Sequence, residues 1–306
     1  MKNLLALLFL AATAFPSTYY VNIGGLGGQE DYAQRFQSAI EELDKLTKAT
    51  PDAKVLSAAG ANATHARIKA ILEEVAKTAT EKDVVVVTLI GHGTFDGETY
   101  KFNLPGPDFT ARELAQWLLP VKAKRQVVVN TTSSSGGSVK ELQRDGRVVI
   151  SATKTGTERL APVFGRYWLE ALRDPQADAD KNEVVTALEA YRYAEAKVTK
   201  YFESNKRLAT EHPLLADTAG GEGVRVPDPS KGQAQVALRT PVLLLGSLQK
   251  AAATPEKQQL LAQREAIETQ IDRLKLRKAA MPSDQYRVEL RGLLLQLARV
   301  QKELDQ

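Results

Sequence analysis

His92 and Ser133 are the two side chains of this sequence whose types and surroundings could perform nucleophilic chemistry together. His92 lies between two glycines, directly after the apolar run Val84–Ile90. Ser133 follows a second apolar run, residues 127–129, and lies 41 residues after the histidine. An imidazole can accept the proton of a hydroxyl and so make the oxygen a nucleophile. The pattern indicates either a hydrolase-type site or two ordinary strand-to-helix loops.

These two positions are held by a chain that alternates apolar runs with amphipathic helical patterns. Parallel strands joined by helices form a sheet covered on both faces, and their carboxyl ends share one edge. We therefore expect His92 and Ser133 at the same edge. The predicted strands are residues 19–23, 54–56, 84–90, 127–130, 147–152 and 235–245. The predicted helices are residues 30–50, 64–78, one opened by Phe109-Thr110, 139–144, 163–173 and 184–203.

The residues around both positions resemble the clan of cysteine peptidases that contains legumain, the caspases and the gingipains. In that clan one strand ends on His-Gly, and a later strand runs into Ala-Cys-x-Ser-Gly. Here the segments read Gly91-His92-Gly93 and Thr132-Ser133-Ser134-Ser135-Gly136. The legumain-like branch fits best, and the resemblance covers residues 18–245. It implies an α/β fold: a caspase-like three-layer α/β/α sandwich with a mainly parallel sheet.

The same resemblance assigns roles to individual residues. It makes His92 the general base and Gly93 a backbone donor of the oxyanion hole, and it places Ser133 where the clan has its nucleophilic cysteine. Thr131 stands where legumains carry a carboxylate for the asparagine side chain of the substrate. The next strand resembles the substrate-lining strand of the clan, which implies that the substrate is contacted by Ser151, Ala152 and Thr153.

The chain has no cysteine, and serine at position 133 changes the chemistry. A thiol, with a pKa of about 8.5, needs only a modest neighbour to become a thiolate, whereas a hydroxyl needs a base that a third group orients. Asp96 and Glu98 follow His92, but no pattern places either behind the imidazole. The sequence favours a non-catalytic protein that binds peptide along the edge strand after Ala152. A serine hydrolase, or another use of the cleft, is the alternative.

Residues 178–189 match the pattern of a calcium-binding loop. Ligand oxygens are offered at positions 1, 3, 5, 7 and 12 of the loop by Asp178, Asp180, Asn182, the Val184 carbonyl and Glu189. Glu183 occupies position 6, where the turn prefers a glycine with positive φ. The alternative is an acidic helix start with Asp180 and Asn182 as caps. Any metal here is expected to be structural Ca²⁺, and no organic cofactor is predicted.

The N-terminus predicts export. Lys2 precedes a short apolar run, residues 4–12, and Ala12-Thr13-Ala14 matches a small-x-small cleavage site. We expect residues 1–14 to be a signal peptide of a periplasmic or secreted bacterial protein, the alternative being a buried first element. The run is too short for a stable membrane span. The net charge of +4 is small and spread along the chain, so no nucleic-acid partner is predicted.

The C-terminal part of the chain has a different character. Residues 256–278 and 283–305 each carry apolar residues at helical spacing, with Pro282-Ser283 between them. Two long apolar stripes predict a helical hairpin that docks on a partner or self-associates, rather than two marginal helices. The predicted organisation is a signal peptide (1–14), an α/β domain (17–250) and the hairpin (251–306). A structural envelope protein that assembles through this hairpin is a third possible function.

Two further features of the sequence are not expected to form functional sites. The glycine-rich segment 24–28 lies between a strand and a helix, but Glu30 stands where a dinucleotide-binding loop has its third glycine. We therefore expect a plain turn there. His65 and His212 have no partner nearby in the sequence, so each is predicted to be a surface or structurally satisfied residue.

Overall fold

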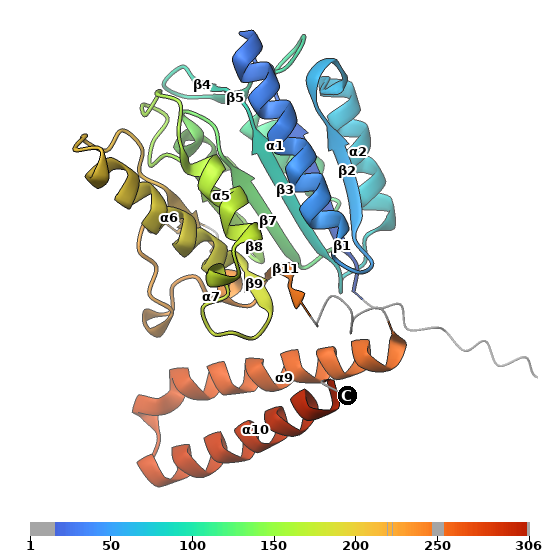
Figure 1. The fold of residues 1–306 in the computed structure, drawn as a ribbon, viewed down its shortest axis with the longest axis vertical. Helices are drawn as coiled ribbons and strands as arrows, with labels where there is room; N and C mark the ends of the chain where they lie inside the picture. The colour runs from blue at the N-terminus through green and yellow to red at the C-terminus, as the bar shows by residue number, and fades with distance from the viewer. Residues whose placement is uncertain (1–15, 219, 222, 247–253, 305–306) are drawn as a thin grey trace, which may run out of the picture.

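The computed structural model describes residues 16–218, 220, 221, 223–246 and 254–304 (Figure 1). The predicted signal peptide, residues 1–14, lies outside the described residues. Within them a mainly parallel sheet is covered by helices on both faces, which is the three-layer α/β/α arrangement predicted from the sequence.

Six strands form the central sheet, in the order β10-β8-β7-β3-β1-β2. All neighbours pair in parallel except β10, which runs antiparallel to β8 at one edge. Leu89 pairs with Asn130, so β3 and β7 end side by side. The segments that carry His92 and Ser133 therefore leave the sheet at the same edge. The strands are β1 Thr18–Gly24, β2 Lys54–Ala58, β3 Val84–Ile90, β7 Arg125–Asn130, β8 Arg147–Ser151 and β10 Leu214–Ala216.

Strand β3 shows why both faces of the sheet are covered. All seven of its residues are buried, and its apolar side chains are divided between two hydrophobic clusters, one on each face of the sheet. Val84 and Val86 pack under α1, α5 and α6, whereas Val85 and Val87 pack under α2, α3 and α4. An uninterrupted apolar run is what a parallel strand buried on both faces requires. The helices are α1 Glu30–Lys48, α2 His65–Thr78, α3 Ala111–Leu118, α4 Val139–Leu142, α5 Phe164–Arg173 and α6 Ala187–Ser204.

Threonine caps fix where three of these helices begin. Thr64 accepts a hydrogen bond from the Arg67 amide before α2, and Thr110 forms a capping box with Glu113 before α3. Thr186 forms a second capping box with Glu189, so α6 begins at Ala187. Such caps contribute about 1 kcal/mol each. The helix predicted from residue 184 therefore starts three residues too early.

Residues Val184–Thr186 instead form strand β9, which pairs antiparallel with β11, Pro241–Leu244. This β-branched run suits a strand better than a helix. The strand predicted over residues 235–245 was also wrong in part, because its first half is the short helix α7, Gln235–Leu238. Pro241 begins β11, where a missing amide hydrogen disturbs the pairing least.

A small antiparallel sheet follows β3 directly and was not indicated by the sequence pattern. It consists of β4 Gly93–Phe95, β5 Tyr100–Phe102 and β6 Phe109–Thr110, in the order β4-β5-β6. It takes the chain back across the carboxyl edge of the central sheet. Short 3₁₀ turns lie at Gly60–Asn62, Ser135–Ser138, Pro175–Ala177, Pro229–Lys231 and Lys278–Ala280.

The C-terminal helices α9, Pro255–Arg277, and α10, Ser283–Leu304, form a hairpin that lies across one end of the α/β unit (Figure 1). They bury a small apolar cluster between them, built on Ile267, Ile271, Val300 and Leu304. Among the helices that the structure describes, none is both long enough and apolar enough to cross a membrane.

Candidate functional site

Ser133 and the backbone of Gly93 meet at the carboxyl edge of the sheet. The Ser133 hydroxyl donates to the Gly93 carbonyl oxygen at 3.0 Å. The Gly93 amide in turn lies 3.5 Å from Ser133 Oγ. Ser133 is only 7% exposed. The proton that a general base would have to remove is therefore engaged by a backbone carbonyl.

The His92 imidazole is held by other elements. Its Nε2 lies 3.2 Å from the Gly27 carbonyl oxygen, and its ring packs edge-on against Tyr32 and Phe36 of α1, with centroid distances of 4.7 and 5.1 Å. A carbonyl only accepts, so this contact assigns the Nε2 proton of the neutral ring. Among the described residues no hydrogen bond joins His92 to Ser133. The predicted base and nucleophile share a rim, but they do not form a pair.

No carboxylate of the described residues is hydrogen-bonded to His92. Asp96 Oδ1 accepts from the Thr99 amide at 2.8 Å and from the Glu98 amide at 3.0 Å. These bonds, that from Thr99 first, lower the pKa of Asp96. Asp96 closes its own turn and leaves the imidazole without an orienting acid.

Close approach of two chain segments explains the glycine at position 93. A Cβ atom there would lie 2.5 Å from Thr132 Oγ1 and 2.6 Å from the Ser133 carbonyl oxygen. Any larger residue would therefore push the turn after β7 away from the end of β3. The same approach directs the Gly93 amide at Ser133 Oγ.

The turn after β7 is fixed by a buried polar network around Thr132. Its hydroxyl lies 2.6 Å from Tyr100 Oη and donates to Asn130 Oδ1 at 2.9 Å. Asn130 Nδ2 donates onward to Ser138 Oγ at 3.1 Å. Burial raises the pKa of Tyr100 well above its usual range. A satisfied buried network of this kind rigidifies the turn.

The residues expected to contact substrate lie inside the protein. Ser151, Ala152 and Thr153 are each 0% exposed. The Ser151 hydroxyl donates to the Thr153 carbonyl, and β8 is paired with β7 on one side and β10 on the other. Strand β8 ends at Ser151, opposite Leu214 of β10, and the described residues 152–183 form no strand, so the edge strand expected after Ala152 is not present.

Thr131 does not project into an open pocket. Its hydroxyl donates to the Leu89 carbonyl oxygen at 2.8 Å, and the residue is 6% exposed. Gly165 of α5 lies directly against it, since a Cβ atom at position 165 would be 3.0 Å from Thr131 Cβ. The position that legumains use for specificity is here part of the packing between β7 and α5.

The sequence did not reveal the partners of the other two histidines. His65 Nε2 lies 3.2 Å from Glu113 Oε1, and His212 Nδ1 lies 2.6 Å from Glu158 Oε1. The second pair belongs to the same rim, because the Glu158 carbonyl accepts from the Ser134 amide at 2.8 Å. Ser134 has φ of 58°, in the left-handed region. Glu158 and His212 are 54 residues apart, so no local pattern could have joined them.

Glu211, next to His212, is a buried carboxyl group. It is 2% exposed, and its Oε2 accepts from the Val163 amide at 2.7 Å. Its Oε1 has no hydrogen-bond partner among the described residues. Burial raises the pKa of Glu211 to about 8. The group is therefore largely protonated near neutral pH.

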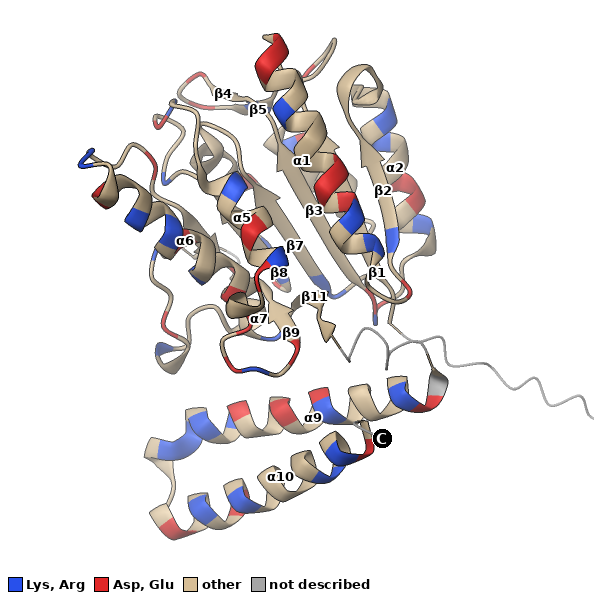
Figure 2. Ribbon diagram, viewed as in Figure 1, with Lys and Arg blue, Asp and Glu red and all other residues tan. Residues whose placement is uncertain are grey.

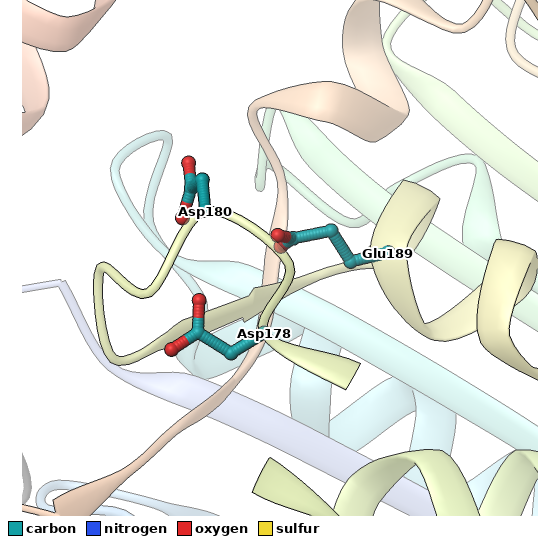
Figure 3. A group of neighbouring side chains, drawn as sticks. All are labelled: Asp178, Asp180 and Glu189. Atoms are coloured by element: carbon teal, nitrogen blue, oxygen red, sulfur yellow. The ribbon is translucent and has the colours of Figure 1, made fainter. Parts of the chain in front are cut away.

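Three carboxylates of the acidic loop, residues 178–189, lie close together. Ligand atoms of Asp178, Asp180 and Glu189 lie within 4.8 Å of one another (Figure 3). Asp178 accepts from the amides of Asn182 and Glu183, both at 3.0 Å, and Glu189 Oε1 accepts from the Ala179 amide at 3.0 Å. These bonds wrap the loop around the carboxylates.

Two residues of this loop have left-handed backbone conformations. Lys181 and Glu183 have φ of 61° and 62°, so Glu183 takes the left-handed conformation usually given to glycine. Burial, then the charge of Glu189 and to a smaller extent those of Asp178 and Glu268, raise the pKa of Asp180 to about 6. The donor set of carboxylate, amide and carbonyl oxygens suits a hard cation.

The glycine-rich segment after β1 lines a cavity of about 460 Å³ beside the start of α1. Gly25 accommodates the Asn103 carbonyl oxygen, which would lie 2.7 Å from a Cβ atom. The Gly27 carbonyl oxygen lies 3.2 Å from His92 Nε2. Glu30 and Asp31 fill the first turn of α1 and disfavour an anion there.

No family model matches this sequence, and no curated protein matches it either. Similar solved structures include a protein from Geobacter sulfurreducens, at a TM-score of 0.49 and 12% identity, over 76% of this chain and 100% of that one. The Drosophila initiator caspase Dronc matches at a TM-score of 0.46 and 12% identity, over 69% and 82% of the two chains. Caspase-1 of Spodoptera frugiperda matches at 0.47 and 12% identity, over 67% and 87%. All three TM-scores are below 0.5.

Proposed function

We propose that this chain is a non-catalytic protein with a caspase- and legumain-like peptidase fold, which binds peptide without cleaving it. The observation that supports this most directly is the separate engagement of the two catalytic candidates. Ser133 donates to Gly93, whereas His92 is bound to Gly27 and packed against α1. A serine nucleophile needs a base within hydrogen-bond reach that is itself oriented by a third group. Neither requirement is met in this arrangement.

The backbone donor assigned to an oxyanion hole is also engaged. The Gly93 amide faces Ser133 Oγ at 3.5 Å, whereas an oxyanion donor has to face the position that the substrate oxygen reaches. Losing base, nucleophile and oxyanion donor together removes many orders of magnitude in rate. The fold is kept while the Ser133 hydroxyl, the His92 imidazole and the Gly93 amide are bound within the protein, and this favours a binding role.

A peptide ligand fits the carboxyl rim of the sheet, where the loops of parallel sheets make their binding sites. Leu26 and Leu160, on two loops that leave this edge, are 43% and 60% exposed and offer apolar contacts. Ser151 to Thr153 are buried, so we assign peptide contacts to the loop beyond them, residues 154–160.

An active-site serine probe tests this function against its alternative, a hydrolase that uses Ser133 with His92 as the base. We expect no labelling of the folded protein by a fluorophosphonate, and identical results for wild type and Ser133→Ala. The immobilised protein should nevertheless retain peptides from a library, and the retained peptides should be recovered uncleaved. Labelling that disappears in Ser133→Ala would establish the hydrolase instead.

We also propose that the acidic loop binds a structural Ca²⁺ ion through Asp178, Asp180, Asn182, the Val184 carbonyl and Glu189. The support is the gathering of three carboxylates on a loop with positive φ at Glu183. Terbium luminescence tests this, because Tb³⁺ occupies calcium sites. We expect saturable emission that Ca²⁺ competes away and that Asp178→Asn abolishes. Emission that persists in Asp178→Asn would place the ion elsewhere.

Export remains a proposal for residues 1–14. Sequencing the N-terminus of the protein recovered from a periplasmic or culture fraction tests it, and we expect the mature chain to begin just after Ala14. An intact Met1 in a cytoplasmic fraction would contradict export. The alternative of an envelope protein assembled through the hairpin predicts a defined oligomer in sedimentation, which a monomer would exclude.

A further inference from the structure

The α9–α10 hairpin and the α/β unit have separate apolar cores. The hairpin buries its own cluster, and Val184 is a hydrophobic side chain of the α/β unit that packs against this cluster. The hairpin lies at the amino-terminal edge of the sheet, because Arg125, the first residue of β7, pairs with Glu265 of α9. This edge is opposite the rim that carries His92 and Ser133.

Polar contacts also join the described parts of the hairpin and the α/β unit. Gln258 donates to Asp52 at 2.8 Å, Arg239 lies 3.9 Å from Asp272, and Arg125 binds Glu265. The side chains of the last two pairs are 25–51% exposed. Figure 2 shows both signs of charge along α9. Exposed ion pairs contribute between about 0 and 1 kcal/mol each and weaken with salt.

A cavity of about 650 Å³ lies between the two surfaces. Apolar side chains from both sides line it, including Tyr20, Leu188 and Leu243 of the α/β unit and Leu261 and Leu294 of the hairpin. The described residues of the two surfaces are joined at Val184 and at the polar contacts given above. Docking therefore depends on a small number of contacts.

Arg264 makes the most buried of these contacts, and it reaches the acidic loop. Its side chain is 6% exposed, binds Glu268 at 2.9 Å and donates to the Asn182 carbonyl oxygen. Val184, two residues later in the loop, provides the apolar contact. The backbone of Glu183 lies between them in the left-handed conformation. The conformation of the loop thus decides whether both contact points face the hairpin.

We propose that the α9–α10 hairpin is a strap that can detach from the α/β unit, and that its docking is coupled to the conformation of the loop 178–189. A divalent cation bound in the loop strengthens the docking of this strap. Linkage requires that a cation which orders the loop strengthens docking, and that docking strengthens cation binding by the same factor. The cation step rests on the metal site proposed above, whereas detachment itself does not. Release uncovers the cavity and its apolar lining at the edge opposite the peptide rim.

The cysteine-free chain allows site-specific labelling for the test. Val288→Cys on α10 and Leu208→Cys on the α/β unit replace side chains that are 72% and 91% exposed, and a donor and acceptor dye on them report docking by energy transfer. We expect efficient transfer at 50 mM salt and at least a twofold loss at 1 M salt, where the screening length falls to about 3 Å. Far-UV circular dichroism should stay constant, which distinguishes detachment from unfolding.

Two arginine variants test whether docking depends on the contact of Arg264 with the loop. Arg264→Ala should reduce transfer already at 50 mM salt, because it removes the bonds to Asn182 and Glu268. Arg287→Ala is the matched control, since this α10 arginine is 71% exposed and pairs with Asp284 of its own helix. Transfer that withstands both 1 M salt and Arg264→Ala shows a permanent interface and overturns the strap.

Calcium addition at an intermediate salt concentration tests the coupling. We expect transfer to recover with the same midpoint as the competition against Tb³⁺, and not to recover in Asp178→Asn. If Ca²⁺ displaces Tb³⁺ but leaves transfer unchanged, the coupling is wrong and the metal site stands. If terbium does not bind, the metal site and the cation step both fail, and the salt series still decides the strap.

Discussion

Ser133 donates its hydroxyl hydrogen to Gly93, the residue whose amide the resemblance to peptidases would reserve for a substrate oxygen. Nucleophile and oxyanion donor are thus satisfied by each other. His92, one residue earlier, is satisfied by Gly27. A site in which each candidate catalytic group already has an internal partner is arranged for rigidity, and this motivates the proposed binding role.

The first prediction concerns a thiol at position 133. In Ser133→Cys the imidazole stays on Gly27, so the thiol lacks a cationic partner, and its pKa should be at or above the ordinary value of about 8.5. Alkylation by iodoacetamide should therefore rise with pH through that value. Ser204→Cys, on the exposed end of α6, is the control for an unperturbed thiol. A reaction that is already maximal at pH 6 would show an ion pair between His92 and the introduced thiolate.

The second prediction concerns the approach of two segments at Gly93. Gly93→Ala places a methyl group 2.5 Å from Thr132 Oγ1, and the neighbouring backbone limits relaxation. We expect a loss of about 1–3 kcal/mol in the free energy of unfolding, as for other overpacked sites, measured by urea titration. Gly292→Ala, on α10 with nothing within 4 Å of the added carbon, should instead be neutral or slightly stabilising. Equal stability of Gly93→Ala and wild type would contradict the close approach.

The third prediction concerns pH and Glu211. Burial raises its pKa from 4.5 to about 8, so the folded protein keeps a proton that the unfolded chain has lost. The favourable contribution is complete below the unfolded value, declines as the pH rises, and is lost above the folded value. Glu211→Gln should match wild type near pH 4.5 and be more stable by up to a few kcal/mol at pH 9.

Urea unfolding at both pH values measures this difference. Glu203→Gln, an exposed carboxyl on α6, is the matched control and should leave the pH dependence of wild type unchanged. A Glu211→Gln protein whose stability declines over this interval as steeply as that of wild type would show that Glu211 is already ionised in the fold.

The fourth prediction concerns metal and stability. If the acidic loop holds Ca²⁺, a free concentration of 100 times the dissociation constant stabilises the folded state by about 2.7 kcal/mol. Calorimetry should therefore show a midpoint several degrees higher with Ca²⁺ than with a chelator. Asp178→Asn should remove the difference, whereas Asp284→Asn, on the exposed start of α10, should keep it. A midpoint indifferent to Ca²⁺ in wild type argues against the ion.

Local patterns in the sequence predicted much of the fold. The apolar run Val84–Ile90 indicated a strand buried on both faces, and all of its residues are buried. Thr64 was expected to cap a helix, and it accepts the Arg67 amide. Errors arose where a pattern is short: residues 184–186 were assigned to the following helix, although a partner strand 55 residues away in β11 makes them β9.

The candidate site could be predicted only in outline. Gly91-His92-Gly93 and Ser133 follow neighbouring strands, and topology alone brings such segments to one edge. The pairing of Ser151 could not be foreseen, because it depends on β10, a three-residue strand without a distinctive pattern. Nor could the burial of Thr153, which is bonded to Ser135 and Gly136 in the turn after β7. The same holds for the pair of Glu158 and His212, which meets across 54 residues.

The sequence by itself determined most strands of the central sheet and the helices that cover it, the edge at which His92 and Ser133 emerge, and the absence of a thiol. Only the tertiary structure decided that the imidazole binds Gly27, that the hydroxyl binds Gly93, and that α9 rests on the acidic loop. The physical reason is that periodicity and capping act over a few residues, whereas the partner of a polar side chain is chosen by packing between distant segments.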